Sequence, residues 1–380
     1  NDYYCDADQG VPFYRTANIR DGYFRHDDLR YVTHQFNEKN KKSQIKNDDI
    51  LIARVGANLG MVCKATGLDR VANMANAIII KSASAVDADP DFYAYFLLSP
   101  MGKSQIFAGA AGGAQGVFNT KLTQQIIAPV PPLAEQKKIA EILSTWDRAI
   151  EVAEAQLEAA RTSKRALMQQ LLTGKRRFPE FEGEEWKEIR LGDVLREVKR
   201  PVVWSDDDLY RLVSVRRRSG GLFHREDLYG RDIKTKNLKN ASSGDFLISK
   251  MQVVHGAMGL VRDEFDGMQI SGSYIAINSK NEDQLNIEFF DWLSRMPEMY
   301  HRAYLCSYGV HIEKMTFNFN LFLKERIKLP SSVKEQAQIV EVLDCAEREV
   351  TELEQHITKL RTEKKALMQQ LLTGKRRVVV

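Results

Sequence analysis

Three consecutive arginines, Arg216–Arg218, are the side chains whose type and spacing point most directly to a charged ligand, and three lysines follow between positions 234 and 239. Guanidinium groups bind phosphates and the hydrogen-bonding edges of bases, so such a cluster favours nucleic acid as the ligand. Clusters of this size are also common on solvated surfaces, and the net charge of the chain is only +4. Both interpretations of the triplet therefore stay open at this point.

Motifs that would indicate catalysis are incomplete. Gly102-Lys103-Ser104 has the end of a phosphate-binding Walker A loop, but Leu97 stands where the first glycine is required. The glycine-rich run 109–116 does not join a strand to a helix as a dinucleotide loop does. The seven histidines have neither metalloprotease spacing nor a triad neighbourhood. We therefore predict a non-enzyme with no catalytic residue, no metal site and no cofactor bound by this chain.

The four cysteines are scattered and include no C-x-x-C pair, which argues against a zinc site and fits a reducing compartment. No apolar run approaches the length of a membrane-spanning helix. These two observations predict a cytoplasmic protein with no membrane partner. At 380 residues the chain is long enough for two or more independent cores.

A repeated sequence motif indicates which segments of the chain position the arginine and lysine clusters. KRALMQQLLTGKRR at 164–177 returns as KKALMQQLLTGKRR at 364–377, with 13 of 14 positions identical at an offset of 200. So long an offset indicates a duplicated domain-plus-helix unit, because the repeats of solenoid proteins are only about 20–50 residues long. The repeat divides the chain into a first globular segment (1–131), a first long helix (132–177), a second globular segment (178–330) and a second long helix (331–377).

Both long helices show apolar residues at alternating spacings of four and three, the heptad pattern of a coiled coil. The seam of the first is predicted at Ile139, Leu143, Trp146, Ile150, Leu157, Lys164, Leu167 and Leu171. The seam of the second is predicted at Ile339, Leu343, Val350, Leu353, Ile357, Leu360, Lys364, Leu367 and Leu371. Lys164 and Lys364 interrupt the two seams at equivalent places, where a polar residue fixes register. Ser332 and Glu335 have the spacing of a capping box at the start of the second helix.

We expect the two helices to pair antiparallel within one chain, which would put the globular segments at opposite ends and give the repeat a pseudo-two-fold axis. Pairing between two chains stays open. Strands are predicted at 50–55, 77–81 and 273–278, and helices at 92–98 and 289–294. The fold class is therefore α+β, with two mixed α/β domains joined by two long helices. The stretch WKEIRLGDV at 186–194 has no counterpart before residue 1, so the first globular segment is expected to be incomplete at its N-terminus.

The helix ends stayed nearly identical while the globular segments diverged. This pattern indicates that the two helices have the same function, while the two globular segments have related but different functions. Such an arrangement is typical of a protein that recognises a bipartite target. Two DNA half-sites at fixed separation are such a target, because half-site spacing is set by protein geometry.

The chain resembles a known family at this point, the DNA-specificity subunit of type I restriction–modification systems. The resemblance rests on PPLAEQ at 131–136 and LMQQLLTGKRR at 167–177, each with a copy in the second half. DILIARVGANLG at 49–60, its counterpart at 244–248, and GGAQ at 112–115 add to it. The chain departs from the pattern where Lys250-Met251-Gln252 replaces Arg54-Val55-Gly56.

The resemblance implies two target-recognition domains, each reading half of a split double-stranded DNA sequence, held apart by an antiparallel coiled coil. It implies no catalytic activity in this chain. Its partners would be two methyltransferase subunits, which use S-adenosylmethionine to methylate adenine, and restriction subunits, which use ATP and Mg to translocate and cleave DNA. Two other readings remain: a coiled-coil scaffold whose globular ends bind proteins, and a specificity protein for a fused nuclease–methyltransferase.

Candidate DNA-binding residues are the Arg, Lys, Asn, Gln, His and Tyr side chains at expected groove-facing loops. In the first globular segment they are Arg20, Arg25, Arg54, Gln115, Asn119 and Lys121. In the second they are Arg216, Arg217, Arg218, Lys250, His255, Tyr308 and Lys314.

Overall fold

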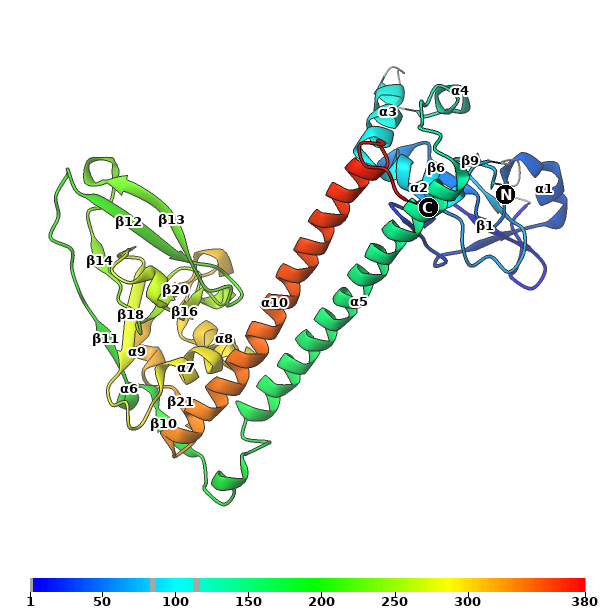
Figure 1. Cartoon of the computed structure of the whole chain (residues 1–380). Coiled ribbons are helices and arrows are strands. Elements are labelled where there is room, and N and C mark those ends of the chain that lie inside the picture. Colours follow the sequence, from blue (N-terminus) through cyan, green and yellow to red (C-terminus); the bar gives the residue numbers. More distant parts are fainter. Residues whose placement is uncertain (1–2, 83–86, 112–116, 380) are drawn as a thin grey trace. The chain divides into compact units, whose positions relative to one another are not determined.

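The computed structural model describes residues 3–82, 87–111 and 117–379, and the chain divides into two compact units. Unit 1 contains residues 1–156 and 353–380, and unit 2 contains residues 157–352. Each unit therefore holds one globular segment, part of the helix α5 (Leu133–Leu171) and part of the helix α10 (Val333–Leu371) (Figure 1). Among the described residues, no helix is both long and apolar enough to cross a membrane.

In unit 1, a four-stranded sheet has the order β4 (Arg30–Val32), β1 (Val11–Tyr14), β8 (Ala72–Met74) and β5 (Gln44–Ile45). A three-stranded sheet has the order β7 (Val62–Lys64), β6 (Ile50–Ala53) and β9 (Ala77–Ile80). A short hairpin joins β2 (Ile19–Arg20) to β3 (Tyr23–Phe24). The helices are α1 (His34–Lys39), α2 (Pro90–Leu98), α3 (Pro100–Ala111) and α4 (Thr120–Thr123).

In unit 2, one four-stranded sheet has the order β13 (Leu222–Tyr229), β12 (Leu209–Val215), β17 (Gln269–Ser271) and β14 (Leu238–Asn240). The other has the order β11 (Leu195–Val198), β18 (Tyr274–Ser279), β15 (Phe246–Ser249) and β16 (Met258–Leu260). Two strand pairs complete it: β10 (Lys187–Arg190) with β21 (Arg326–Leu329), and β19 (Ser307–Tyr308) with β20 (Thr316–Phe317). The helices are α6 (Leu191–Val194), α7 (Ile287–Ser294), α8 (Pro297–Leu305) and α9 (Phe319–Phe322).

The two globular segments share their sheet topology. In both, a parallel strand pair lies at the centre of a four-stranded sheet, β1 with β8 in unit 1 and β12 with β17 in unit 2. An antiparallel strand flanks each pair, β5 on β8 and β14 on β17. The weak sequence similarity between the segments therefore corresponds to the same strand order, and the predicted mixed α/β fold class is confirmed.

The segments differ where β1 and β12 meet their antiparallel neighbours. In unit 1 a long excursion that includes β2 and β3 separates β1 from β4, which pair over three residues. In unit 2 a short turn joins β12 directly to β13, and the two strands pair over seven residues (Figure 1). Four consecutive buried residues at the end of β12, 212–215, anchor this hairpin on the core, and its tip carries the arginine triplet.

Both long helices end as the repeated motif predicts. The α-helical hydrogen bonding stops at Leu171 and Leu371, and the remaining residues of each predicted helix form a turn. Gly174 and Gly374 have φ values of +69° and +70°, the left-handed conformation that glycine adopts at low cost after a helix. In each copy the amide of the second residue past the glycine bonds back to a glutamine carbonyl, Arg176 to Gln170 and Arg376 to Gln370, both at 3.1 Å.

Candidate nucleic-acid interface

The arginine triplet lies on the turn between β12 and β13, and backbone hydrogen bonds to a second element support this turn. Arg218 and Ser219 have φ values of +59° and +50°, a region that non-glycine residues enter only with support. The support comes from the short helix η7 (Val253–His255) and the residue after it. The amide of Arg218 donates to the carbonyl of His255 at 2.7 Å, and the amide of Ser219 donates to that of Gly256 at 2.9 Å. The tip is thus held on a second element.

The three arginines have different surroundings. Arg216 stacks over the ring of Phe223 at 4.5 Å and donates to the carbonyl of Leu222 at 2.9 Å, so part of its role is structural. Arg217 donates to the carboxylate of Glu313 at 2.7 Å, with half of its side chain exposed. Arg218 is exposed, and its side chain forms no hydrogen bond or ion pair with the described part of the chain. All three arginines are exposed, and Arg217 and Arg218 are the two whose side chains do not also support the turn.

Glu313 was not singled out from the sequence, and it joins two of the candidates. It lies on the short helix η9 (Ile312–Lys314), and its carboxylate is also 3.1 Å from Nε2 of His255, without hydrogen-bond alignment. In the sequence, the only indication of a role for Glu313 was its position next to the candidate Lys314. The fold is needed to show that its carboxylate contacts Arg217 and His255. Arg217, His255 and Glu313 thus converge from three separate elements.

The other candidates of the second globular segment are placed less favourably or lie apart. Lys250 is half-buried, and its ammonium donates to the carbonyl of Gly272 at 2.9 Å. Tyr308 is 54% exposed on β19. The side chain of Lys314 lies outside the described part of the structure.

In the first globular segment, the fold brings Arg54 and the loop before α4 together. The carbonyl of Arg54 accepts from the amide of Phe118 at 3.1 Å, and its Nε is buried without a hydrogen-bond partner among the described residues. Asn119 is the N-cap of α4 and accepts from the amide of Leu122 at 3.0 Å, while Lys121 is exposed. Gln115 lies outside the described residues.

Arg20 and Arg25 lie near the β2–β3 hairpin and are both engaged locally. Arg20 donates to its neighbouring carbonyl, that of Ile19, at 3.0 Å. Arg25 donates through Nε to Asp27 at 2.8 Å, and this contact raises the pKa of the guanidinium. Contact of any of these side chains with DNA stays a prediction.

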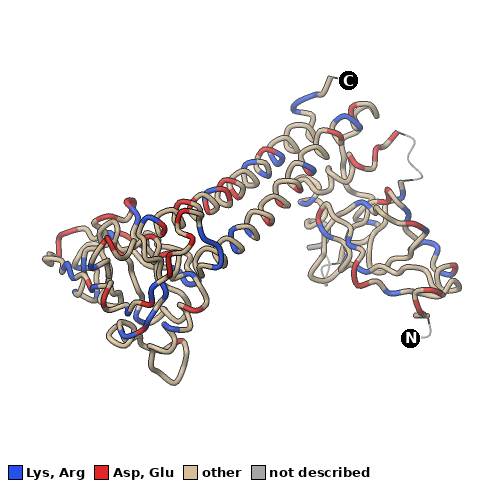
Figure 2. The backbone as a smooth tube through the Cα atoms, turned by 90° about the horizontal axis from the view of Figure 1, so that it is seen from below, with Lys and Arg blue, Asp and Glu red and all other residues tan. Residues whose placement is uncertain are grey.

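The predicted seam positions of α5 and α10 are all buried or half-buried, while most residues between them are exposed. Within unit 1, the α5 residues Asp147 and Glu154 form ion pairs with Lys364 and Arg361 of α10. From the first ion pair to the second, the residue number increases on α5 and decreases on α10. These two stretches of helix are therefore antiparallel. Within unit 2, Lys164 of α5 lies 2.5 Å from Glu347 of α10. Figure 2 shows basic and acidic residues interspersed along both helices.

A second pair of ion pairs joins the end of each helix to the start of the other. In unit 1 the buried carboxylate of Glu135 accepts two hydrogen bonds from Arg377, at 2.7 and 2.6 Å, and these lower its pKa. In unit 2 the buried carboxylate of Glu335 accepts from Arg177 at 2.5 and 2.8 Å. Both oxygens of Glu335 are thus bonded to an arginine that lies 158 residues away, a contact that the local capping-box spacing did not predict.

The glutamine next to each of these acids attaches the helix to its globular segment. Gln136 accepts from the amide of Asp89, the N-cap of α2, at 2.8 Å, and donates to two carbonyls. Gln336 accepts from the amide of Asn286, the N-cap of α7, at 2.9 Å, and likewise donates to two carbonyls. The two units thus use the same junction.

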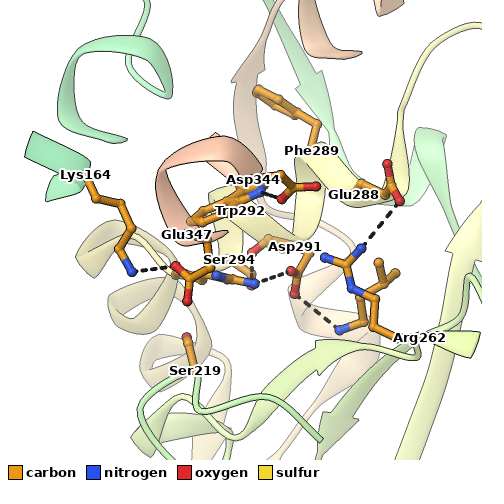
Figure 3. A network of polar contacts seen from close by, with 12 residues as sticks. Lys164, Ser219, Arg262, Glu288, Phe289, Asp291, Trp292, Ser294, Asp344 and Glu347 are labelled. Carbon is orange, nitrogen blue, oxygen red and sulfur yellow. Dashed lines mark hydrogen bonds and ion pairs between the residues drawn. The ribbon is translucent and has the colours of Figure 1, made fainter. Parts of the chain in front are cut away.

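A polar network reinforces this junction in unit 2 (Figure 3). The indole of Trp292 on α7 donates to Asp344 on α10 at 2.8 Å. Asp291, also on α7, is buried and accepts from Arg295 at 2.7 Å and from the amide of Leu260 at 3.2 Å. In unit 1, Tyr95 on α2 donates to Asp147 on α5 at 2.7 Å, and burial, followed by this bond, raises the pKa of the phenol. A helix of each globular segment is therefore fixed to a long helix by a part-buried hydrogen bond.

Comparisons with known proteins agree with this architecture. Residues 4–160 match the family model of the type I restriction modification DNA specificity domain. The chain is 24% identical to the type I restriction enzyme MjaVIII specificity subunit of Methanocaldococcus jannaschii, over 61% of this chain and 49% of that protein. It is also 24% identical to the putative type I restriction enzyme MjaX specificity subunit of the same organism, over 97% of this chain and 88% of that protein. The chain thus spans about half of the first relative and most of the second.

Solved structures have a similar fold. The HsdS subunit from Thermoanaerobacter tengcongensis superposes with a TM-score of 0.51 at 17% identity, covering 98% of this chain and 94% of that one. A type I restriction–modification system S subunit from M. genitalium superposes with a TM-score of 0.57 at 12% identity, covering 97% and 90%. The sequence relatives support the predicted family resemblance, and the solved structures show the same fold.

Proposed function

We propose that this chain, a relative of the type I restriction–modification DNA-specificity subunits, is a non-catalytic subunit that reads a bipartite sequence in double-stranded DNA. One globular segment would read each half of the target. The observation that carries the proposal is the contrast between the two units: the strand order of one four-stranded sheet and the helix junctions are the same, while the loops at the predicted DNA-binding positions differ. Divergent loops on a common frame are suited to reading two different half-sites.

We further propose that α5 and α10 form one antiparallel coiled coil that spaces the two recognition segments with pseudo-two-fold symmetry. The opposite chain directions of the ion pairs within unit 1 support this arrangement. So does the equivalent placement of Lys164 in unit 2 and Lys364 in unit 1, each paired with an acid of the other helix. A polar pair inside an apolar seam fixes register, and register would determine the spacing of the half-sites.

The expected partners are two methyltransferase subunits and restriction subunits, with S-adenosylmethionine, ATP and Mg bound on those partners. The repeated motif supports two identical partners, because six solvent-exposed positions of the motif are identical in both copies, and the one position that differs, Arg165 against Lys365, keeps its positive charge. The identical positions are Ala166, Gln169, Gln170, Thr173, Lys175 and Arg176, and their counterparts Ala366, Gln369, Gln370, Thr373, Lys375 and Arg376. Helix packing alone does not require identity at exposed positions. A cytoplasmic location fits the free state of all four cysteines.

Methylation mapping in cells that carry the chain with its partner subunits tests this function. We expect methylated adenines in a single split sequence, and we expect replacement of residues 178–330 by another segment of the same fold to change only one half of it. The competing function is a scaffold that binds proteins, which the 97% exposed Val310 beside Tyr308 favours. Methylation that does not depend on this chain would support the scaffold and contradict DNA recognition.

A further inference from the structure

The carboxylate of Glu313 lies among the cations proposed to meet DNA. Arg217 approaches it from the β12–β13 turn at 2.7 Å, and His255 approaches from η7 at 3.1 Å. A carboxylate in this place repels the phosphates that the neighbouring arginines attract, so it weakens general binding to DNA. An acid at such a position can, however, discriminate between ligands.

The geometry of Glu313 leaves it free to accept further hydrogen bonds. Arg217 donates to Oε2, and Oε1 faces His255 without hydrogen-bond alignment. An ionised carboxylate has about four acceptor sites, and 56% of this side chain is exposed. The contacts from two other elements orient the group before any ligand arrives, which reduces the entropic cost of forming a specific bond.

We propose that Glu313 is a specificity-determining residue that accepts a hydrogen bond from an exocyclic amino group in the major groove, N4 of cytosine or N6 of adenine. Carboxylates recognise cytosine in this way, and guanine and thymine offer only acceptors at the equivalent edge. Arg217, bonded to the same carboxylate, would hold this acceptor in place, and its half-exposed side chain stays available to a phosphate. This inference rests on the proposed function of DNA recognition.

The test titrates the full chain, with its partner subunits, against the duplex identified by methylation mapping and against duplexes with each base pair changed in turn. In the wild type each mismatch should weaken binding by roughly 5- to 150-fold. In Glu313→Ala, discrimination should disappear at one position of one half-site and persist at all others. Binding to unrelated duplex should stay the same or tighten, because one negative charge has been removed.

Two further measurements identify the contact itself. A base analogue that lacks the amino group at that position should weaken wild-type binding as much as the alanine substitution does, and should weaken the Glu313→Ala variant no further. Glu313→Gln, which keeps an acceptor oxygen, should retain part of the preference. Glu282→Ala is the matched control, because Glu282 is also an exposed acid of unit 2 and contacts neither Arg217 nor His255 in the described part of the chain.

A Glu313→Ala variant whose affinity changes by the same factor on every duplex would overturn the proposal, since the carboxylate would then act only as a counter-ion for Arg217. Unchanged discrimination at every position would overturn it as well. Failure of the proposed function is seen separately, in the wild type alone: a wild-type complex that binds all duplexes equally would contradict DNA recognition and this inference together.

Discussion

The ammonium of Lys164 donates a 2.5 Å hydrogen bond to the carboxylate of Glu347, so the lysine that interrupts the seam of α5 finds its partner on α10. Two hundred positions later, Lys364 of α10 pairs with Asp147 of α5. The polar seam position is therefore satisfied in both units by an acid of the other helix. The ion pair at this position sets the register of the two helices more than it stabilises the fold, because exposed and half-exposed ion pairs contribute little to the free energy of unfolding.

Replacement of Lys164 by Met should change the free energy of unfolding only slightly. Glu347 is 42% exposed and water screens the pair, so we expect a coupling of about 0.5 kcal/mol between the two residues. A double-mutant cycle with Glu347→Gln, measured by urea denaturation, gives this coupling directly. Lys364→Met with Asp147→Asn is the matched cycle in unit 1. Coupling above about 2 kcal/mol in either cycle would contradict the predicted small contribution of these pairs to stability.

Arg177→Ala should destabilise unit 2 much more strongly. The Glu335 carboxylate is 1% exposed, and loss of its partner leaves a buried, unpaired charge. Breaking such a pair costs about 3 kcal/mol. Arg176→Ala is the control, because Arg176 is an exposed neighbour in the same motif and should change the stability by less than about 0.5 kcal/mol. Equal effects of the two substitutions in denaturant titrations would contradict this prediction.

Acid should weaken the corresponding junction in unit 1. Hydrogen bonds from Arg377 lower the pKa of Glu135 below its value in the unfolded chain, about 4.3. The stability from this group is therefore complete above about pH 4.3 and is lost as the pH falls through the lower pKa of the folded state. Glu135→Gln should flatten the dependence of unfolding free energy on pH below about pH 4. Identical acid slopes for the variant and the wild type would show that the Glu135 carboxylate makes no such contribution.

Arg217→Ala and Arg218→Ala should each reduce the salt dependence of DNA binding. Removal of one phosphate contact lowers the slope of log K against log salt concentration by about 0.9. Arg216→Ala is a poorer probe, because loss of its stacking on Phe223 also disturbs the turn. Arg326→Ala, an exposed arginine of β21, should leave the slope unchanged. If neither variant of the triplet changes the slope, these side chains do not contact phosphate.

Substitution of the exposed repeat residues should change the number of partners bound. Gln169→Arg alters an exposed position of α5 in unit 2, and Gln369→Arg alters its counterpart on α10 in unit 1. We expect each single variant to bind one methyltransferase subunit and the double variant to bind none, as measured by sedimentation or light scattering. Binding of two subunits by the double variant would exclude this surface.

The sequence was most informative where structure is repetitive. The seam of α5 and α10 follows from a heptad period, and the helix ends follow from Gly174 and Gly374, since both depend on nearby residues. The partners of Glu335 and Glu313 could not be predicted, because the fold brings each to an arginine far away in sequence. Local spacing even suggested a different role for Glu335. The hydrogen bond from the amide of Arg218 to the carbonyl of His255 could not be predicted either, because these residues are also far apart in sequence.

Glu135 and Gln136 are adjacent, yet they respond differently to their surroundings. The bonds that hold α10 at Glu135 depend on charge, whereas Gln136 bonds to the loop before α2 through an uncharged amide. Protonation or high salt weakens the first set and leaves the second intact. Acid should therefore unfold unit 1 stepwise. The segment after α10 should dissociate from Glu135 first, while Gln136 still holds the globular segment on the start of α5.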